Sequence, residues 1–459
     1  MHTTQSPDKD QEKNNAARDD IADFFAHFHI GSRLNRSGIR KIRGVRPLDL
    51  VSAIFALPFQ KTTLYWGIVR SQTLAFRKDA VYDILNRSNF NWRSLLLSLA
   101  AAVIRFFTPL TNTERESVFI LDDTLYKRDR STSVELLATV YDHCAHTCYR
   151  GFRCLCLVWS DGVSTAPIDF ALLSSTDPKK RHQEASAAVD KRRCGYRRRI
   201  EAQRHATDLL ESMVKRALRA GIRARYILMD SWFAFPAIIA MLSAHTPVIC
   251  MLKRMKTVYY TWRGQKVTLT GLFQRVKKRR GKARVLASVL VTIAEGQTVK
   301  IVFVRDRRKK NWLALLSTDI TVSDADVVRI YGKRWDIEVF FKMSKQYLQL
   351  ETGVQIRNFD GLIAHTTIVL MRYLFLSYRQ RCETDDRTLG ELFFARCDEL
   401  RDITLVEALH RMLTLVADEI RKTELASEEL IHNIINTIMG KIIKKFNLLP
   451  VLPTKRNAA

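Results

Sequence analysis

The chain has 459 residues and carries 75 Lys plus Arg against 47 Asp plus Glu, which gives a formal net charge of +28 at pH 7. Hydrophobic residues make up 47% of it, beside only 17 Gly and 10 Pro, so the composition provides for folded cores and excludes a low-complexity or collagen-like chain. A positive surplus of this size is most often matched by a polyanion, usually nucleic acid, although a merely soluble basic protein stays open at this point.

The cysteines and the apolar stretches indicate a compartment. Four of the eight cysteines fall between positions 144 and 156, and the polar N-terminus shows no signal peptide, so we expect reduced thiols in the cytoplasm. The longest apolar stretches, 94–107 and 362–376, are interrupted by Arg105 and by His365 and Arg372. Neither offers about twenty uninterrupted apolar residues, so no membrane partner is expected.

The N-terminal part divides into a leader and a helical region. Residues 1–20 are polar, charged and free of aromatics, which is typical of a flexible leader. Over 21–110, apolar residues recur at spacings of three and four, which predicts short helices at 48–57, 63–71, 79–88 and 92–107. Basic residues between these helices suit a DNA-binding region, and a helical cap on the next domain is an equally good interpretation.

The pattern changes to α/β after residue 110, and we expect the first part of a core domain over 111–247. An unbroken apolar run at 117–121 ends in acids, which predicts a buried strand with carboxylates at its carboxyl end. Strands are predicted at 136–142, 152–162 and 166–175, then an amphipathic helix closed by Gly221, then a strand at 225–230 that again ends in an acid. This order is that of an RNase H-like α/β domain.

Three further regions complete the expected organisation. Six predicted strands form a β-rich insertion over 248–320, which also contains the basic runs 275–284 and 305–310, expected to lie along DNA phosphates. Residues 321–380 are helical and return to the core, and 381–459 form a C-terminal helical region. The apolar tail is most simply packing of the core, with a dimer contact as the alternative.

One predicted helix carries a polar face. If 331–345 is a single helix, Tyr331, Arg334, Glu338 and Lys345 fall within about 60° of one another around its axis, while the apolar residues fall elsewhere. A carboxylate there can hold a divalent metal while Arg and Lys bind phosphate oxygens. The alternative is a solvated face on which Arg334 and Glu338 form an ordinary (i, i+4) pair.

Three acids distant in sequence can complete such a site. Asp122 and Asp230 stand at the ends of two predicted strands, and Glu338 stands on the helix. Three carboxylates can hold a pair of Mg²⁺ ions, which stabilise the attacking and leaving oxygens of an in-line phosphoryl displacement. Their mutual repulsion would make the site dependent on metal.

These motifs resemble the three catalytic regions of DDE transposases of the insertion-sequence-four family. The resemblance is carried by LDDT at 121–124, LMDSW at 228–232 and the spaced string Tyr331, Arg334, Glu338 and Lys345. It covers roughly 115–350 and implies an RNase H-like core in which Asp122, Asp230 and Glu338 are the catalytic, metal-binding triad, with two Mg²⁺ ions as cofactor and Mn²⁺ as a substitute. The D-x-T form favours Asp122, but Asp123 stays open because the unbroken apolar run does not reveal which face of the strand each acid is on.

The same resemblance implies DNA contacts. Arg334 and Lys345 would hold phosphates beside the cut, and Tyr331 a phosphate near a hairpin. Trp312 would stack on a base flipped out of that hairpin, unless it is simply a buried strand residue. Relatives tend to have Arg-x-Lys at the start of the insertion; Lys253 is retained here, and Arg254 could substitute for the missing arginine.

The expected function is that of a bacterial, cytoplasmic and nucleoid-associated transposase. It would bind double-stranded DNA at the terminal inverted repeats of its element and at a target, cleave, form a hairpin intermediate and join ends, as a homodimer on paired ends. The rivals are a DNA-binding relative that does not cut and an RNase H-like nuclease without strand transfer. A zinc site at His143, Cys144, His146 and Cys148 is the weaker alternative for that loop, because the spacing matches no standard finger. No Gly-rich phosphate loop is present, so ATP is not implied.

Overall fold

The computed structural model describes residues 20–41, 43–70, 76–111, 115–142, 145–279, 283–293, 296–306 and 311–382, together with isolated positions between 413 and 441. The leader expected over 1–20 lies outside the described residues except for Asp20, and so does nearly all of the C-terminal region expected over 381–459. The basic runs 275–284 and 305–310 lie outside them in part.

The described part is a mixed α/β protein built on one large sheet of eleven strands. Ten of them follow the order β2-β3-β1-β5-β6-β11-β10-β9-β7-β8, and β4 pairs with β3 beside this path. The strands are β1 (Val118–Lys127), β2 (Ala138–Asp142), β3 (Thr147–Ser160), β4 (Thr165–Leu173), β5 (Tyr226–Met229), β6 (Val248–Leu252), β7 (Tyr259–Trp262), β8 (Gln265–Thr268), β9 (Val285–Thr292), β10 (Thr298–Asp306) and β11 (Asn311–Ser317).

The centre of this sheet has the RNase H-like order that the sequence predicts. β1, β3 and β4 form the antiparallel part, and β5 and β6 add to β1 in parallel. Their near-continuous burial follows from β-branched and apolar runs covered on both faces. β6 falls inside the segment expected to begin the insertion at 248, yet it pairs in parallel with β5 and antiparallel with β11. The remaining strands of the insertion therefore extend the core sheet.

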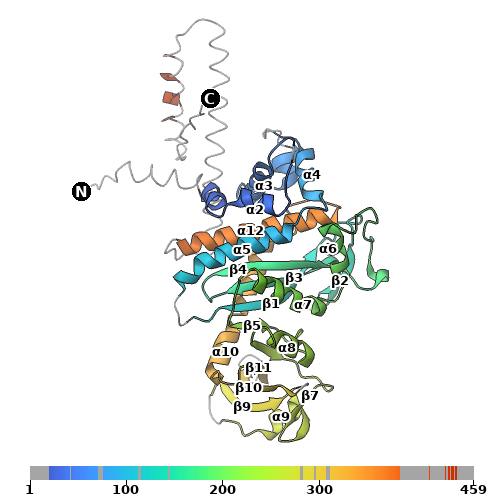
Figure 1. Cartoon of the computed structure of the whole chain (residues 1–459), viewed down its shortest axis with the longest axis vertical. Helices are drawn as coiled ribbons and strands as arrows, with labels where there is room; N and C mark the ends of the chain where they lie inside the picture. The colour runs from blue at the N-terminus through green and yellow to red at the C-terminus, as the bar shows by residue number, and fades with distance from the viewer. Residues whose placement is uncertain are drawn as a thin grey trace, which may run out of the picture.

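Helices cover both faces of the sheet (Figure 1). The long helices α5 and α12 run side by side and pack on β4, and the N-terminal helices lie beyond them, while α6 and α7 also contact β4. The α-helices are α2 (Ile30–Arg36), α3 (Pro47–Ala56), α4 (Lys78–Asn86), α5 (Trp92–Phe107), α6 (Cys194–Ala202), α7 (Leu210–Arg219), α8 (Pro236–Ser243), α9 (Leu269–Arg275), α10 (Asp324–Gly332), α11 (Trp335–Gln346) and α12 (Phe359–Cys382).

Two of these helices are apolar and long. The stretch from Trp92 to Leu110, which contains α5, and α12 could each cross a membrane by length and composition alone. The apolar window of α12 is entirely buried inside the protein, which is the pattern of a core helix. These helices therefore do not indicate a membrane protein.

Four predicted elements differ from the observed ones. β1 does not end at its acids but continues to Lys127, because its second half pairs with β3 as far as Gly151. One of the six strands expected in the insertion, the one over 266–273, becomes helix α9 halfway. The hydroxyl of Thr268 caps the new helix by accepting a hydrogen bond from the backbone N–H of Gly271 at 3.2 Å.

The third difference concerns the helix that carries the site. It is divided into α10 and α11 after Gly332, where the backbone tightens to hydrogen bonds three residues apart, such as the one from the Arg334 N–H to the Tyr331 carbonyl. Because of this break, the angular spacing of one continuous helix does not apply to Tyr331.

The fourth difference lies in the N-terminal part. The segment 63–71, expected as an α-helix, contains a π-helical turn from Tyr65 to Arg70.

Candidate active site

Two carboxylates are brought together by the register of parallel strands. Leu121 of β1 is the partner of Met229 of β5, and the next residue along each chain is an aspartate, Asp122 and Asp230. Because parallel strands run in the same direction, these two acids are lateral neighbours. The first two predicted site residues thus lie side by side at the point where β5 ends.

Alternation along β1 separates Asp122 from Asp123. Successive side chains on a strand point to opposite faces of the sheet. Asp123 pairs with Arg153 of β3, whereas Asp122 accepts a hydrogen bond from the Nη1 atom of Arg334 at 2.7 Å. The structure therefore groups Asp122, not its neighbour, with the residues of α11.

Arg334 connects the strand acid to the helix acid. Its Nη1 atom also lies 3.4 Å from Oε1 of Glu338, so one guanidinium lies between a carboxylate of the sheet and a carboxylate of the helix. The (i, i+4) pair of Arg334 and Glu338 is thus present too, but it is part of a larger cluster. Side-chain exposure is 14% for Asp122 and 43% for Glu338, so this cluster opens to solvent on the helix side.

The cluster has an excess of negative charge. Burial, followed by the charge of Asp230, raises the pKa of Asp122 to about 7, although Arg334 acts in the opposite direction. Burial also raises the pKa of Asp230, whose carboxylate accepts a hydrogen bond from the backbone N–H of Trp232 at 2.9 Å. One arginine is therefore insufficient to stabilise both ionised aspartates, and further positive charge would bind favourably here.

Tyr331 places an unused hydroxyl beside these acids. Its Oη atom is buried and makes no hydrogen bond with any described residue. Burial raises its pKa, and the nearby charges that act on it include those of Arg334, Asp230 and Asp122. A neutral phenol with a free O–H can donate to an incoming oxygen atom.

The two predicted lysines lie at the edge of the cluster. Lys345, at the end of α11, forms an ion pair with Glu351 at 3.6 Å and not with the aspartates. Lys253 is exposed, and its Nζ atom lies 5.3 Å from the ring centre of Trp232, two residues beyond Asp230. The contact with the Trp232 ring thus places the Lys253 ammonium group close in space to the segment that carries Asp230.

Trp312 and Arg254 form a separate group on the extended sheet. The Trp312 ring stacks on Phe273 with centroids 4.4 Å apart, and Cζ of Arg254 lies 3.8 Å from its centre. Two groups this close over one ring cannot share a face, so both faces of the indole are covered. Arg254 also donates hydrogen bonds to the Trp312 carbonyl and to the side chain of Asn311. Trp312 is thus a half-buried residue of β11 in this conformation, and a base could stack on it only after Arg254 moved.

Sequence reasoning missed two exposed tryptophans beside the acids. Trp335 follows Arg334 and is 67% exposed, and Trp232 follows Asp230 by two residues and is 47% exposed. The available signal was their place in the two motifs, since Trp335 directly follows Arg334 and Trp232 lies two residues after Asp230.

The acids are not gathered as tightly as the sequence suggested. No group of three or more His, Cys, Asp and Glu side chains close enough to share a metal ion is found within the part of the chain that the structure describes. Asp122 and Asp230 lie together, but Glu338 is joined to them through Arg334. His143 and Cys144 lie outside the described residues, so the zinc alternative for their loop stays untested.

Comparison with known families places this cluster in context. Residues 69–307, just over half of the chain, match a family model described as DDE superfamily endonuclease. Residues 278–380 match a second model, described as Archaeal putative transposase ISC1217. The first match contains Asp122 and Asp230 and the second contains Glu338. No curated protein matches the chain.

Proposed function

The chain belongs to the DDE superfamily of endonucleases, and from this premise we propose that it is a transposase that cleaves DNA at the ends of its own element and joins those ends to a target. The observation that carries the proposal is the cluster of Asp122, Asp230 and Glu338 around Arg334. Membership of the insertion-sequence-four family, and the hairpin intermediate that it implies, are part of this proposal.

The three acids fit a divalent metal by the chemistry of their oxygen atoms, and Arg334 occupies the space between two of them in this conformation. DDE enzymes use divalent metals, and Asp122, Asp230 and Glu338 offer only carboxylate oxygens, which hard cations such as Mg²⁺ prefer. The raised pKa of Asp122 is further support, because a cation would relieve the repulsion from Asp230. When bound by these three residues, two Mg²⁺ ions would stabilise charge on the attacking and leaving oxygens of the scissile phosphate.

The other side chains bind and orient the DNA. Arg334 can present its guanidinium to two phosphate oxygens at once, and the Tyr331 hydroxyl can donate to a third. Lys345 and Lys253 contribute positive charge on either side of the acids. In the cleavage step water attacks phosphorus, and the bond to the 3′ oxygen breaks to leave a 3′ hydroxyl. In the joining step that hydroxyl attacks a target phosphate, so one phosphodiester replaces another without external energy.

A matched pair of variants tests the assignment. Purified protein is incubated with Mg²⁺ and a supercoiled plasmid that carries the element, and strand cleavage and end joining are measured on gels. Asp122→Asn should abolish both, whereas Asp123→Asn, which changes the adjacent carboxylate that pairs with Arg153, should retain them. Equal loss in both variants would contradict the assignment of Asp122.

Glu338→Gln tests the helix acid in the same assay. It should abolish cleavage and leave binding of the end DNA nearly intact, because the amide keeps the shape of the side chain and removes only its charge. A variant that still nicks the plasmid would refute the role of Glu338. Wild-type protein that binds but never cuts would favour a non-cutting relative, and cutting without joining would favour a nuclease.

A further inference from the structure

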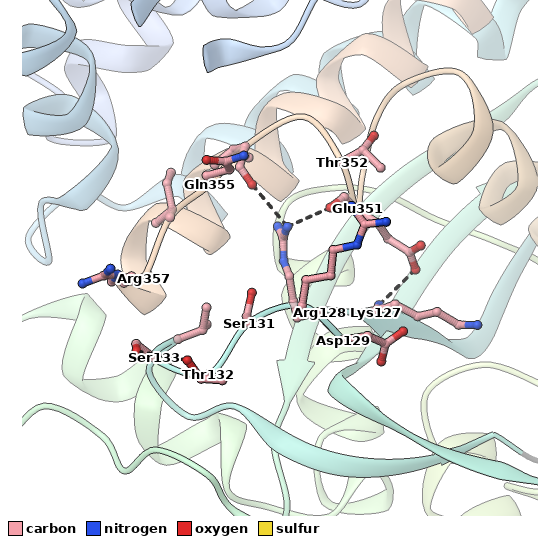
Figure 2. A pocket seen from close by; sticks show the side chains of 14 residues that line it. Lys127, Arg128, Asp129, Ser131, Thr132, Ser133, Glu351, Thr352, Gln355 and Arg357 are labelled. Carbon is pink, nitrogen blue, oxygen red and sulfur yellow. Dashed lines mark hydrogen bonds between the residues drawn. The ribbon is translucent and has the colours of Figure 1, made fainter. Parts of the chain in front are cut away.

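A cavity lined by both polar and apolar residues lies where β1, the strand that carries Asp122, ends. It has a volume of about 860 Å³ and lies between the connection from β1 to β2 and the connection from α11 to α12, which are more than 200 residues apart in sequence (Figure 2). Its lining combines hydroxyl groups with four basic side chains, which are Lys127, Arg128, Arg130 and Arg357.

The walls of the cavity are fixed by hydrogen bonds. Figure 2 shows Arg128 reaching from one wall to the other, where its Nη1 atom donates to the carbonyl oxygens of Glu351 at 2.7 Å and Val354 at 3.2 Å. A second link joins the same two connections, because the Glu135 carboxylate accepts a hydrogen bond from the backbone N–H of Phe359 at 2.9 Å and another from Arg199. The cavity is therefore formed before any ligand arrives, which lowers the entropic cost of binding.

The charge that remains available in the cavity is positive. The Glu351 carboxylate is already engaged by the Lys127 N–H and by Lys345, and Asp129 accepts a hydrogen bond from the Arg150 N–H. Arg130 and Arg357, one on each wall, are exposed and make no side-chain hydrogen bond or ion pair with another described residue. Two exposed arginines in the lining of a cavity that also has four hydroxyl side chains suit a phosphate-bearing ligand.

Two elements lead directly from the acids to this cavity. Seven residues of α11, or about 10 Å, separate Glu338 from Lys345, whose ion-pair partner Glu351 lines the cavity. From Asp122 to Lys127 is five residues of β1, or about 16 Å. At 3.4 Å per step of one strand, these lengths correspond to about three to five nucleotides.

We propose that this cavity is a second DNA subsite, which binds the sugar–phosphate backbone about three to five nucleotides from the phosphate that is cut. This rests on the proposed function for the location of the cut, but the binding itself requires no cleavage. Arg130 and Arg357 contact the phosphates, and Arg128 holds the two walls in place. The subsite fixes the register of the duplex on the acids.

Binding in EDTA tests this subsite separately from catalysis. The double variant Arg130→Gln, Arg357→Gln is compared with wild type by fluorescence anisotropy on a labelled duplex of about 30 base pairs over a range of salt. The control is Arg263→Gln, Lys266→Gln, which removes two exposed charges from the β7–β8 hairpin at the opposite end of the sheet. Circular dichroism checks that both variants are folded.

Loss of two phosphate contacts should reduce the slope of log K against log salt by about 2, so that the affinity lost between about 50 and 200 mM salt becomes about tenfold smaller. The control should change the slope by clearly less. An equal change in both double variants, or none in the first, would overturn the subsite. If the slope falls as expected but the wild-type protein never cuts DNA, the subsite stands and the proposed function fails.

Neutral methylphosphonates locate the subsite on the DNA. Placed singly along an end fragment, they should weaken binding of wild type about three to five nucleotides from the cut and have no further effect on the double variant there. Sensitivity of the double variant equal to that of wild type at those positions would overturn the register. If the double variant loses binding of free nucleotide while its slope of log K against log salt for DNA equals that of wild type, the cavity holds a nucleotide and the proposal is wrong.

Discussion

Replacing Asp122 by asparagine should stabilise the metal-free protein at alkaline pH. Burial and the neighbouring Asp230 raise the pKa of Asp122 from 3.8 to about 7, so the folded protein binds more protons than the unfolded chain between these values. Raising the pH through this window therefore lowers the free energy of unfolding. A difference of this size corresponds to about 4 kcal/mol in total, and the part that falls between about pH 5 and pH 8 is about 3 kcal/mol.

Urea unfolding in EDTA measures this effect. The free energy of unfolding of wild type should fall relative to Asp122→Asn by about 3 kcal/mol from about pH 5 to pH 8, since asparagine does not titrate. A constant offset, such as a weaker hydrogen bond from Arg334 to the amide, does not affect this comparison. Parallel pH profiles for the two proteins would refute the environment described for Asp122.

Asp169→Asn is the control, because this buried aspartate is shifted in the opposite direction. Burial opposes the shift, but the charges of Arg93 and Arg216 lower the pKa of Asp169 below 3.8. Its stabilising effect is lost only as the pH falls below that value, so Asp169→Asn should give a constant difference from wild type between about pH 5 and pH 8.

Addition of metal gives a further test of Asp122. Mg²⁺ at about 100 times its dissociation constant should raise the free energy of unfolding of wild type by about 3 kcal/mol and that of Asp122→Asn by much less.

Three substitutions should change stability through named contacts, each measured by chemical denaturation. Asp169→Asn should cost about 3–5 kcal/mol, because it leaves the half-buried Arg216 without its carboxylate and Arg93 with Glu201 alone. Gly151→Ala should cost more than about 2 kcal/mol, because its Cβ would stand 2.1 Å from the carbonyl oxygen of Tyr126; a neutral result would contradict the observed pairing of β1 with β3. Trp312→Ala should lower the free energy of unfolding by about 2–3 kcal/mol, because it removes the stack on Phe273, and Trp312→Phe should lower it by much less. No loss of stability in Trp312→Ala would show that the ring is free in solution.

The order of the core strands could be predicted because each has a local signal. Apolar runs, turn residues and the acids after two of them predict β1, β3, β4 and β5 and their sequence. The face of each acid could not be predicted, because an unbroken apolar run has no alternation from which to determine it. The partner decides it: Arg153 on β3 pairs with Asp123, and Arg334, just before α11, pairs with Asp122.

Contacts that join distant segments left no local signal. Nothing in the sequence of β6 indicates that it pairs with both β5 and β11, so the boundary expected at 248 fell inside the sheet. The break after Gly332 is equally hidden, since one glycine in a helical pattern is usually tolerated. The cavity that Arg130 and Arg357 line depends on two loops more than 200 residues apart, which only tertiary packing brings together.

If the proposed function holds, Arg334 would link binding of metal to binding of DNA. Its guanidinium now lies between Asp122 and Glu338, so a cation that takes those oxygens must displace it. A DNA phosphate offers the displaced guanidinium a new acceptor, and linkage then requires DNA and metal to strengthen each other's binding. Arg334→Gln should therefore bind Mn²⁺ more tightly than wild type without DNA and gain less affinity when DNA is added, as measured by electron paramagnetic resonance of free Mn²⁺. Weaker Mn²⁺ binding by this variant without DNA would show that Arg334 supports the acids and does not compete for them.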